Sequence, residues 1–345
     1  MALFIFDCGR ARGKRMKKSR FAQLLHDTMP TLISKLSLKQ TLVEATAIAE
    51  KYHRGKVVST RMTEFQGMFS KTVIIKLEDE SEWVVQLRDN EIDTTKVALA
   101  RSKLGDVVPF VHRASPLKTH FAFIAPFVHG KVWCKKDKEL SGAERVSIAT
   151  QLGGMLARCA INEDSSAMID SYVIPRLRYI LDHSFVDGTH PQLRARIEDL
   201  ANQATATHVL PLAVIHEDVN SMNIILDDES NGIAALIDWE AASLLPLGSN
   251  AWCIRFLATV NRNRIDYETD DTLPMTRGFW TGLVDNLPLH LKGRKDVLEA
   301  LLSAMQIGLV MFIFWPGYDV IDNADMEQSL KRLNWLEDTL RPMVQ

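Results

Sequence analysis

The sequence predicts an α+β fold of two lobes, in which a small antiparallel-sheet lobe is followed by a larger, mainly helical lobe. Strand-like runs separated by short polar turns dominate residues 57–127. From Ser141 onward, apolar residues instead recur at helical spacing. A chain of 345 residues is also too long for one small core. We place the small lobe at residues 36–128 and the large lobe at residues 129–345.

Composition and charge restrict the partners. The chain is 46% hydrophobic and 24% charged with a net charge of −2, as is ordinary for a globular protein. Residues 10–20 hold seven basic residues and no acidic one, so the rest of the chain is acidic and does not favour nucleic acid. We interpret residues 1–35 as a basic, solvated and partly disordered arm; a targeting or polyanion-binding arm is the alternative.

The lengths of the apolar runs and the spacing of the cysteines indicate in which cellular compartment the protein is expected. No run approaches the ~20 apolar residues of a membrane span, and the longest, residues 307–315, is interpreted as core. The four cysteines lie far apart without C-x-x-C spacing, so neither a zinc site nor a disulfide framework is expected. We therefore expect a cytoplasmic protein with reduced thiols and no membrane partner. The sequence leaves its oligomeric state open.

The small lobe begins with a helix over residues 38–54, where apolar positions have helical spacing and Gly55 provides a stop. Three strands are expected next, over residues 57–62, 72–77 and 83–87. Alternation in the third strand places Val84, Gln86 and Arg88 on one face. A further helix over residues 94–104 ends at Gly105.

The large lobe opens with a helix that has a capping box, because Ser141 is followed three residues later by Glu144. Further helical patterns cover six ranges, which are residues 174–183, 190–206, 250–262, 273–286, 294–312 and 323–340. No internal repeat or low-complexity segment interrupts them.

One polar stretch of the large lobe carries the chemistry. Apolar runs bracket a turn that contains His216, Asp218 and Asn223, and a second apolar run ends at Asp238. Phosphoryl transfer uses such a set: one Asp accepts a hydroxyl proton, an Asn five residues later reaches a magnesium ion, and another Asp holds the metal against the phosphates. The joint pattern is much more specific than any single residue in it.

The segment from His216 to Asn223, together with Ile237-Asp238-Trp239-Glu240, resembles the aminoglycoside phosphotransferase and choline kinase group of protein-kinase-like enzymes, and the fungal-type members most of all. The group usually has Gly where this chain has Glu217. The resemblance is sharp over residues 214–240 and weaker over residues 60–160. It implies a protein-kinase-like two-lobed fold, with ATP and Mg²⁺ as cofactors.

The resemblance also implies roles for particular residues. Asp218 would be the catalytic base and His216 would support its loop, while Asn223 and Asp238 would hold the metal. The adenine would meet the backbone near Pro126 and Val128, at the junction of the lobes. The remaining nucleotide contacts would come from the loop and strand residues Gly67, Ser70, Gln86 and Arg88.

Two departures concern the phosphate site. The strand position expected to carry a cation is Gln86, which has no charge, and the helix over residues 94–104 lacks the carboxylate that would pair with that cation. Arg88 lies on the same strand face, about 6–7 Å further along. Either Arg88 replaces the usual lysine, or the site binds nucleotide weakly or not at all.

The sequence signals for residues that would bind the acceptor substrate are less specific. Glu240 is a candidate for a second metal or substrate contact, and Trp315 for an aromatic wall. Asp266, Glu268 and Asp270 form an acidic loop that could meet an amine, although a solvated loop is the simpler interpretation. The sequence therefore predicts an ATP-dependent small-molecule kinase that acts on a hydroxyl group. The alternatives are a pseudokinase or a kinase fold adapted to other small-molecule chemistry.

Overall fold

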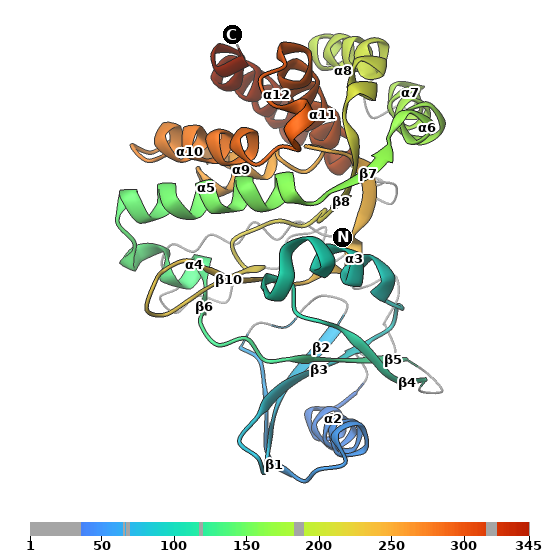
Figure 1. Cartoon of the computed structure of the whole chain (residues 1–345), viewed down its shortest axis with the longest axis vertical. Coiled ribbons are helices and arrows are strands. Elements are labelled where there is room, and N and C mark those ends of the chain that lie inside the picture. Colours follow the sequence, from blue (N-terminus) through green and yellow to red (C-terminus); the bar gives the residue numbers. More distant parts are fainter. Residues whose placement is uncertain are drawn as a thin grey trace.

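The computed structural model describes residues 36–64, 66, 70–116, 120–182, 190–314 and 323–344. These residues form a small lobe around a five-stranded sheet and a larger lobe rich in helices (Figure 1). The predicted α+β fold of two lobes is therefore confirmed. The basic arm at residues 1–35, Gly67 and Trp315 lie outside the described residues, so the expectations about them remain predictions.

The sheet of the small lobe is antiparallel throughout. In spatial order its strands are β1 (Val57–Met62), β2 (Ser70–Leu77), β3 (Glu82–Arg88), β5 (Phe121–Pro126) and β4 (His112–Pro116). Helix α2 (Leu38–His53) begins with a capping box at Ser37 and packs on one face of the sheet. There it buries the β3 residues Val85 and Leu87 in a common apolar cluster. Because strand residues alternate, Gln86 and Arg88 lie on the opposite face, as predicted.

Helix α3 (Thr94–Leu104) joins the small lobe to the large one. Its buried residues Val97, Ala100 and Leu104 belong to the apolar core of the large lobe, which also includes Phe123 of β5. In Figure 1, α3 lies between the five-stranded sheet and the helices of the large lobe. The two lobes therefore share a continuous core on this side.

The large lobe begins after β5. Strand β6 (Lys131–Val132) follows Gly130, which has φ +131°, and a Cβ there would lie 2.3 Å from the Leu226 carbonyl oxygen. The helices are α4 (Trp133–Lys136), α5 (Gly142–Arg158), α6 (Ser166–Met168), α7 (Ile174–Asp182), α8 (Pro191–Gln203), α9 (Cys253–Leu257), α10 (Thr272–Asp285), α11 (Lys295–Ile313) and α12 (Asn323–Val344).

Short strands between these helices carry the polar turns. One three-stranded sheet has the order β10 (Ile233–Leu236), β9 (Ile224–Leu226) and β6. A second has the order β11 (Ser243–Pro246), β8 (Pro211–Ile215) and β7 (Ala160–Asp164). The residues from His216 to Asn223 thus form the turn that leads from one small sheet into the other.

The helix predicted over residues 250–262 is wrong beyond its first part. Only α9 is helical, and the chain then forms a hairpin of β12 (Val260–Arg262) and β13 (Ile265–Tyr267). Asn263 and Arg264 both have positive φ, which suits a two-residue hairpin turn. Tertiary ion pairs of Asp266 also hold this hairpin, and local periodicity cannot reveal them.

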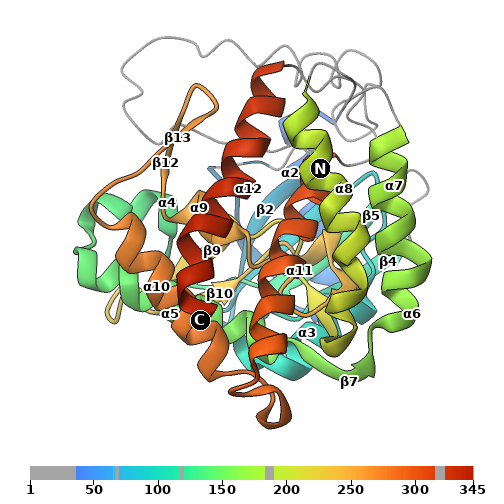
Figure 2. The same ribbon diagram turned by 90° about the horizontal axis from the view of Figure 1, so that it is seen from above.

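Helix α11 is the one helix among the described residues that is long and apolar enough to cross a membrane. However, 72% of its apolar stretch is buried inside the protein. Figure 2 shows α11 beside α12 and α8, within the helical layer of the large lobe. Its apolar character is accounted for by its place in the core.

Candidate active site

The turn after β8 holds Asp218 in place through two asparagine side chains. The Asn223 amide nitrogen donates to the Asp218 carbonyl oxygen at 2.8 Å and to its Oδ2 at 3.2 Å. The Asn220 amide nitrogen donates to Oδ1 of Asp218 at 3.0 Å. Both carboxylate oxygens are therefore oriented before any ligand binds. Asn220 was missed by the sequence analysis, although an asparagine two residues after Asp218 is a usual signal for such a turn.

His216 connects this turn to the segment that carries Asp238. Its Nε2 lies 2.8 Å from the Ile237 carbonyl oxygen, and its Nδ1 accepts from the Asp218 backbone N–H at 3.2 Å. Together these bonds require a neutral ring protonated at Nε2. Burial lowers the pKa of His216, which favours the same neutral form. The ring also packs edge-on against Trp239 at 4.7 Å, so its contacts are those of a structural support.

Asp238 follows β10 and has a left-handed backbone conformation, with φ 67° and ψ 49°. Aspartate tolerates this conformation better than most residues, and such backbones concentrate at functional sites. The Ile237 N–H donates to the Asn223 carbonyl oxygen at 2.9 Å, which ties the segment to the turn that holds Asp218. The structure thus brings Asp218, Asn223 and Asp238 together.

Arg88 reaches this group from the small lobe. Its side chain is only 5% exposed; its Nη1 lies 3.9 Å from Oδ1 of Asp238, and its Nη2 pairs with Glu240. Burial lowers the pKa of the Arg88 guanidinium, while the charge of Asp238 opposes that shift. Among the described residues, no hydrogen-bond partner lies within reach of the buried Arg88 Nε. The positively charged Arg88 side chain therefore lies beside Asp238, and Arg88 follows the uncharged Gln86 by two residues.

Helix α3 has no carboxylate, as the sequence indicates. The carboxylate partner of the strand cation is instead Glu240, in the short 3₁₀ turn Trp239–Ala241. Arg88 of the small lobe therefore forms its ion pair with Glu240 of the large lobe, and not with a residue of α3.

Burial raises the pKa of the Asp218 carboxyl, and the charge of Asp238 acts in the same direction. Hydrogen bonds from Asn220 and Asn223 oppose this shift because they stabilise the carboxylate. The result is a carboxylate more basic than an exposed one, within a site that already holds it in a fixed orientation.

The other nucleotide candidates lie along the same face or edge of the sheet. Ser70 begins β2, is 8% exposed and pairs in register with Arg88, while Gln86 lies opposite Thr72. Pro126 ends β5, and Val128 follows it before β6. Their expected contacts with a nucleotide remain predictions.

The acidic loop is not arranged as a common substrate site. The Asp266 side chain has no exposed surface; it bonds Arg332 at 2.7 Å and lies 3.7 Å from Arg255. Glu268 lies 3.5 Å from Arg255, whereas Asp270 is exposed. The prediction that Asp266 contacts substrate is not supported, since its ion pairs hold the hairpin against α12.

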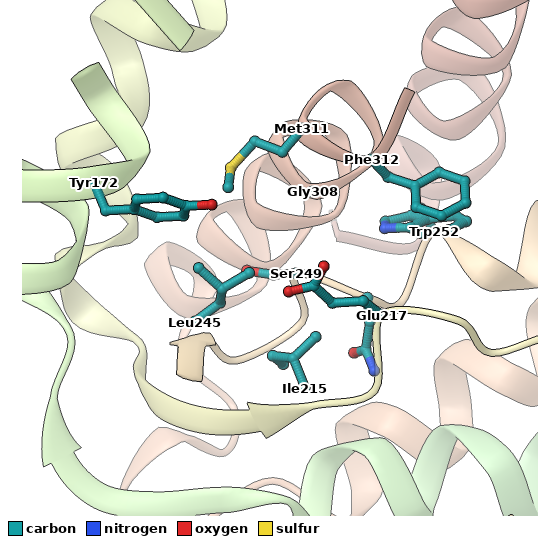
Figure 3. A pocket seen from close by; sticks show the side chains of 10 residues that line it. Tyr172, Ile215, Glu217, Leu245, Ser249, Trp252, Gly308, Met311 and Phe312 are labelled. Carbon is teal, nitrogen blue, oxygen red and sulfur yellow. The ribbon is translucent and has the colours of Figure 1, made fainter. Parts of the chain in front are cut away.

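No signal in the sequence indicates the pocket that lies beside the turn holding Asp218. Glu217 lines it from below, with Tyr172, Met311 and the mutually tilted rings of Trp252 and Phe312 around it (Figure 3). The pocket is partly open to solvent, and its cavity volume of about 20 Å³ is room for one group the size of a water molecule. The residues that line the pocket come from four separate parts of the chain, so no local sequence signal connects them.

The donor atoms near Asp238 fit magnesium. The amide nitrogen of Asn223 is engaged with Asp218, which leaves its side-chain oxygen for a metal, and Asp238 offers a carboxylate. Within the described ranges, no three His, Cys, Asp or Glu side chains gather as a metal site. Magnesium does not need such a group, because it usually takes one or two protein ligands together with phosphate and water oxygens.

Comparisons with known proteins bear on the fold and the family of this chain. The chain resembles in fold a Plasmodium vivax ethanolamine kinase (13% identity, TM-score 0.51, 96% of each chain covered). It also resembles in fold the macrolide 2'-phosphotransferase MphH of Brachybacterium faecium (14% identity, TM-score 0.54, 86% of this chain and 98% of that chain covered). At such low identities these likenesses show the protein-kinase-like fold alone.

No curated protein sequence matches the chain. The model of the phosphotransferase enzyme family matches residues 63–264, which is more than half of the chain and includes Arg88, Asp218, Asn223 and Asp238. The chain therefore belongs to the phosphotransferase enzyme family.

Proposed function

We propose that the protein transfers the γ-phosphoryl group of ATP, bound with Mg²⁺, to a hydroxyl group of a small molecule. The observation that carries this proposal is the convergence of Asp218, Asn223, Asp238 and Arg88 at one place between the lobes. A protein that only binds or scaffolds has no physical need for a base, a metal pair and a phosphate cation together.

Each residue of the group has a distinct task. Asn223 and Asp238 would hold Mg²⁺, which when bound neutralises charge on the phosphates. Arg88 would bind phosphate oxygens through its fork of N–H groups. Asp218 would orient the acceptor hydroxyl and accept its proton as the oxygen–phosphorus bond forms and the bond to the leaving ADP oxygen breaks.

Arg88 is thus proposed as the replacement for the usual strand lysine. Arginine keeps its charge when buried more readily than lysine does, and this position is almost fully buried. Gln86, Ser70 and the backbone near Pro126 and Val128 are proposed to contact the nucleotide further out. We also retain the expectations of a cytoplasmic location and of a small-molecule partner without nucleic acid or membrane.

The test is titration calorimetry of ATP into the full-length protein, with and without Mg²⁺, repeated with Asp238→Ala and Arg88→Ala. Magnesium-dependent binding by the wild type that is lost in both variants is expected. Unaltered binding of Mg-ATP by Asp238→Ala would contradict the assignment. No binding by folded wild type at millimolar ATP would favour the binding-protein alternative, as it would leave these residues without a phosphate ligand.

A further inference from the structure

The hairpin of β12 and β13 projects at the margin of the large lobe (Figure 2). Ion pairs of Asp266 with Arg332 at 2.7 Å and with Arg255 at 3.7 Å fasten it to α12 and α9. The Asn261 amide of β12 also donates to Oδ1 of Asp266 at 2.6 Å. The strands are therefore held in a fixed position, which lowers the entropy cost of binding a partner.

The register of the hairpin shows which backbone groups face outward. Arg262 lies opposite Ile265 across the two-residue turn, and Asn261 opposite Asp266 is the next pair. The residues that flank a two-residue turn exchange hydrogen bonds, and in an antiparallel ladder the following pair turns its N–H and C=O groups away from the partner strand. The N–H and C=O of Asp266 therefore point out of the hairpin, at the free edge of β13.

This edge is open to solvent. The Asp266 side chain has no exposed surface, yet the residue as a whole is only partly buried, so its exposed surface belongs to the backbone. Within the described part of the chain, β13 pairs with β12 alone, and the Asp266 backbone forms no other backbone hydrogen bond. A fixed strand thus presents a hydrogen-bond donor and an acceptor to solvent, which is the arrangement that another strand can join.

The residues around Asp266 are complementary to themselves in antiparallel order. If two copies of β13 pair about Asp266, Arg264 lies opposite Glu268 of the second copy, and Ile265 lies opposite Tyr267. Opposite charges and aliphatic–aromatic pairs directly across from each other stabilise antiparallel strands. Ile265 and Tyr267 are 43% and 48% exposed, and Arg264 and Glu268 are exposed as well. A second copy of the chain therefore matches both the charges and the backbone groups of this edge.

We propose that the free edge of β13 pairs antiparallel with the same edge of a second copy of the chain, about a twofold axis at Asp266. Two hairpins then form one four-stranded sheet in the order β12, β13, β13 and β12. Each Asp266 backbone donates to the other and accepts from it, and each Arg264 lies beside Glu268 of the other copy. The inference is independent of the proposed function, because none of these residues belongs to the group around Asp218 and Asp238.

Sedimentation velocity of the full-length protein at about 5 to 500 µM tests the pairing, since a small interface gives a weak dimer. The wild type is expected to shift from monomer to dimer across this range. Glu268→Arg places two arginines opposite each other and should weaken the dimer by about tenfold or more. Arg264→Asp places two acids there, and aspartate tolerates the positive φ of this position. The combined variant restores opposite charges and should restore the dimer.

Glu299→Arg, which makes the same charge change on an exposed residue of α11, is the control and should leave the dimer unchanged. Thermal unfolding checks that each variant is folded. A dimer that Glu268→Arg and Arg264→Asp leave unchanged, or that the combined variant fails to restore when folded, overturns the proposal. A wild type that stays monomeric at the highest concentration also overturns it, and leaves the edge to a strand of a different protein.

A second measurement needs no substitution. Hydrogen exchange of the wild type is followed in peptides that cover residues 262–270, at low and at high protein concentration. Exchange of the Asp266 amide should slow at high concentration, because its N–H then donates to the other copy. Equal exchange at both concentrations overturns the proposal, even where the combined variant does not fold.

Discussion

The guanidinium of Arg88 pairs with Glu240, and its Nη1 lies 3.9 Å from Oδ1 of Asp238. This relationship joins a strand of the small lobe to the proposed metal segment of the large lobe. It also accounts for the absence of a carboxylate from α3, because Glu240 supplies the partner that a helix would otherwise provide. A cation this deeply buried needs such a partner to remain in place.

A double-mutant cycle tests whether Glu240 acts through Arg88. Arg88→Met should weaken Mg-ATP binding at least tenfold, because the phosphates lose their cation. Glu240→Gln should weaken it less, and the double variant should resemble Arg88→Met alone, since the two residues share one effect. Calorimetry gives the affinities, and Arg294→Met, which breaks an exposed pair with Asp296, is the control. If the losses of Mg-ATP affinity in the two single variants add up in the double variant, Glu240 acts independently of Arg88, for example on the metal.

Replacement of Asp218 should separate binding from chemistry. Asp218→Ala is expected to lower kcat by a factor on the order of 10² to 10⁴, because the acceptor hydroxyl loses its base. The affinity for Mg-ATP should change little, since Asn223 and Asp238 remain. A coupled ADP assay and calorimetry on the same preparation measure the two effects. Retention of full kcat would rule out Asp218 as the base.

Burial raises the pKa of Glu217, which makes its charge a cost to stability. The protonated form is stabilised in the folded state, so this residue's contribution is most favourable at acidic pH and is lost as pH rises through its folded-state pKa. Glu217→Gln should therefore raise the Tm at pH 8 by about 1–3 °C. The gain in Tm should shrink as pH falls toward 4. Thermal unfolding at several pH values measures it, and Glu163→Gln, the same change at an exposed residue of β7, is the control. A gain that grew with acid would contradict this sign.

His216 should contribute stability in the opposite pH direction. Burial lowers its pKa, so the neutral ring stabilises the fold above the ordinary histidine pKa of about 6.5, and this is lost as pH falls through the lowered value. His216→Ala should cost about 2–4 kcal/mol at pH 8, because the Ile237 carbonyl oxygen and the Asp218 N–H lose a partner in a buried site. Denaturant unfolding at pH 8 and pH 5 should show a smaller difference at pH 5.

Two glycines with positive φ provide a matched test of the lobe junction. Gly130→Ala combines a strained backbone with a Cβ 2.3 Å from the Leu226 carbonyl oxygen, and should cost at least about 3 kcal/mol. Gly293→Ala has φ +71° but nothing within 4 Å of its Cβ, so about 1 kcal/mol is expected from conformation alone. If denaturant unfolding gave similar losses of stability for both variants, the Leu226 backbone of β9 would have to move aside at little cost.

Much of the fold and the centre of the site could be predicted from local sequence. Alternation in β3 separates Val85 and Leu87, which pack under α2, from Arg88, which faces the large lobe. The spacing of Asp218 and Asn223 in one turn is short enough for the chain itself to bring them together. The helix prediction over residues 250–262 failed because the hairpin there depends on ion pairs of Asp266 with Arg255 and with the distant Arg332 of α12.

Local patterns in the chain predict the two-lobed fold, the turn from His216 to Asn223 and the strand face on which Arg88 lies, since all three depend on periodicity or on spacings of a few residues. Long-range packing sets three other relationships: Glu240 pairs with Arg88, the Asp266 side chain is buried against Arg332, and Glu217 lines a pocket with Tyr172 and Trp252. These relationships join residues that lie 35 to 152 positions apart in the chain. At such separations, packing of whole elements decides which side chains meet, and no local pattern records it.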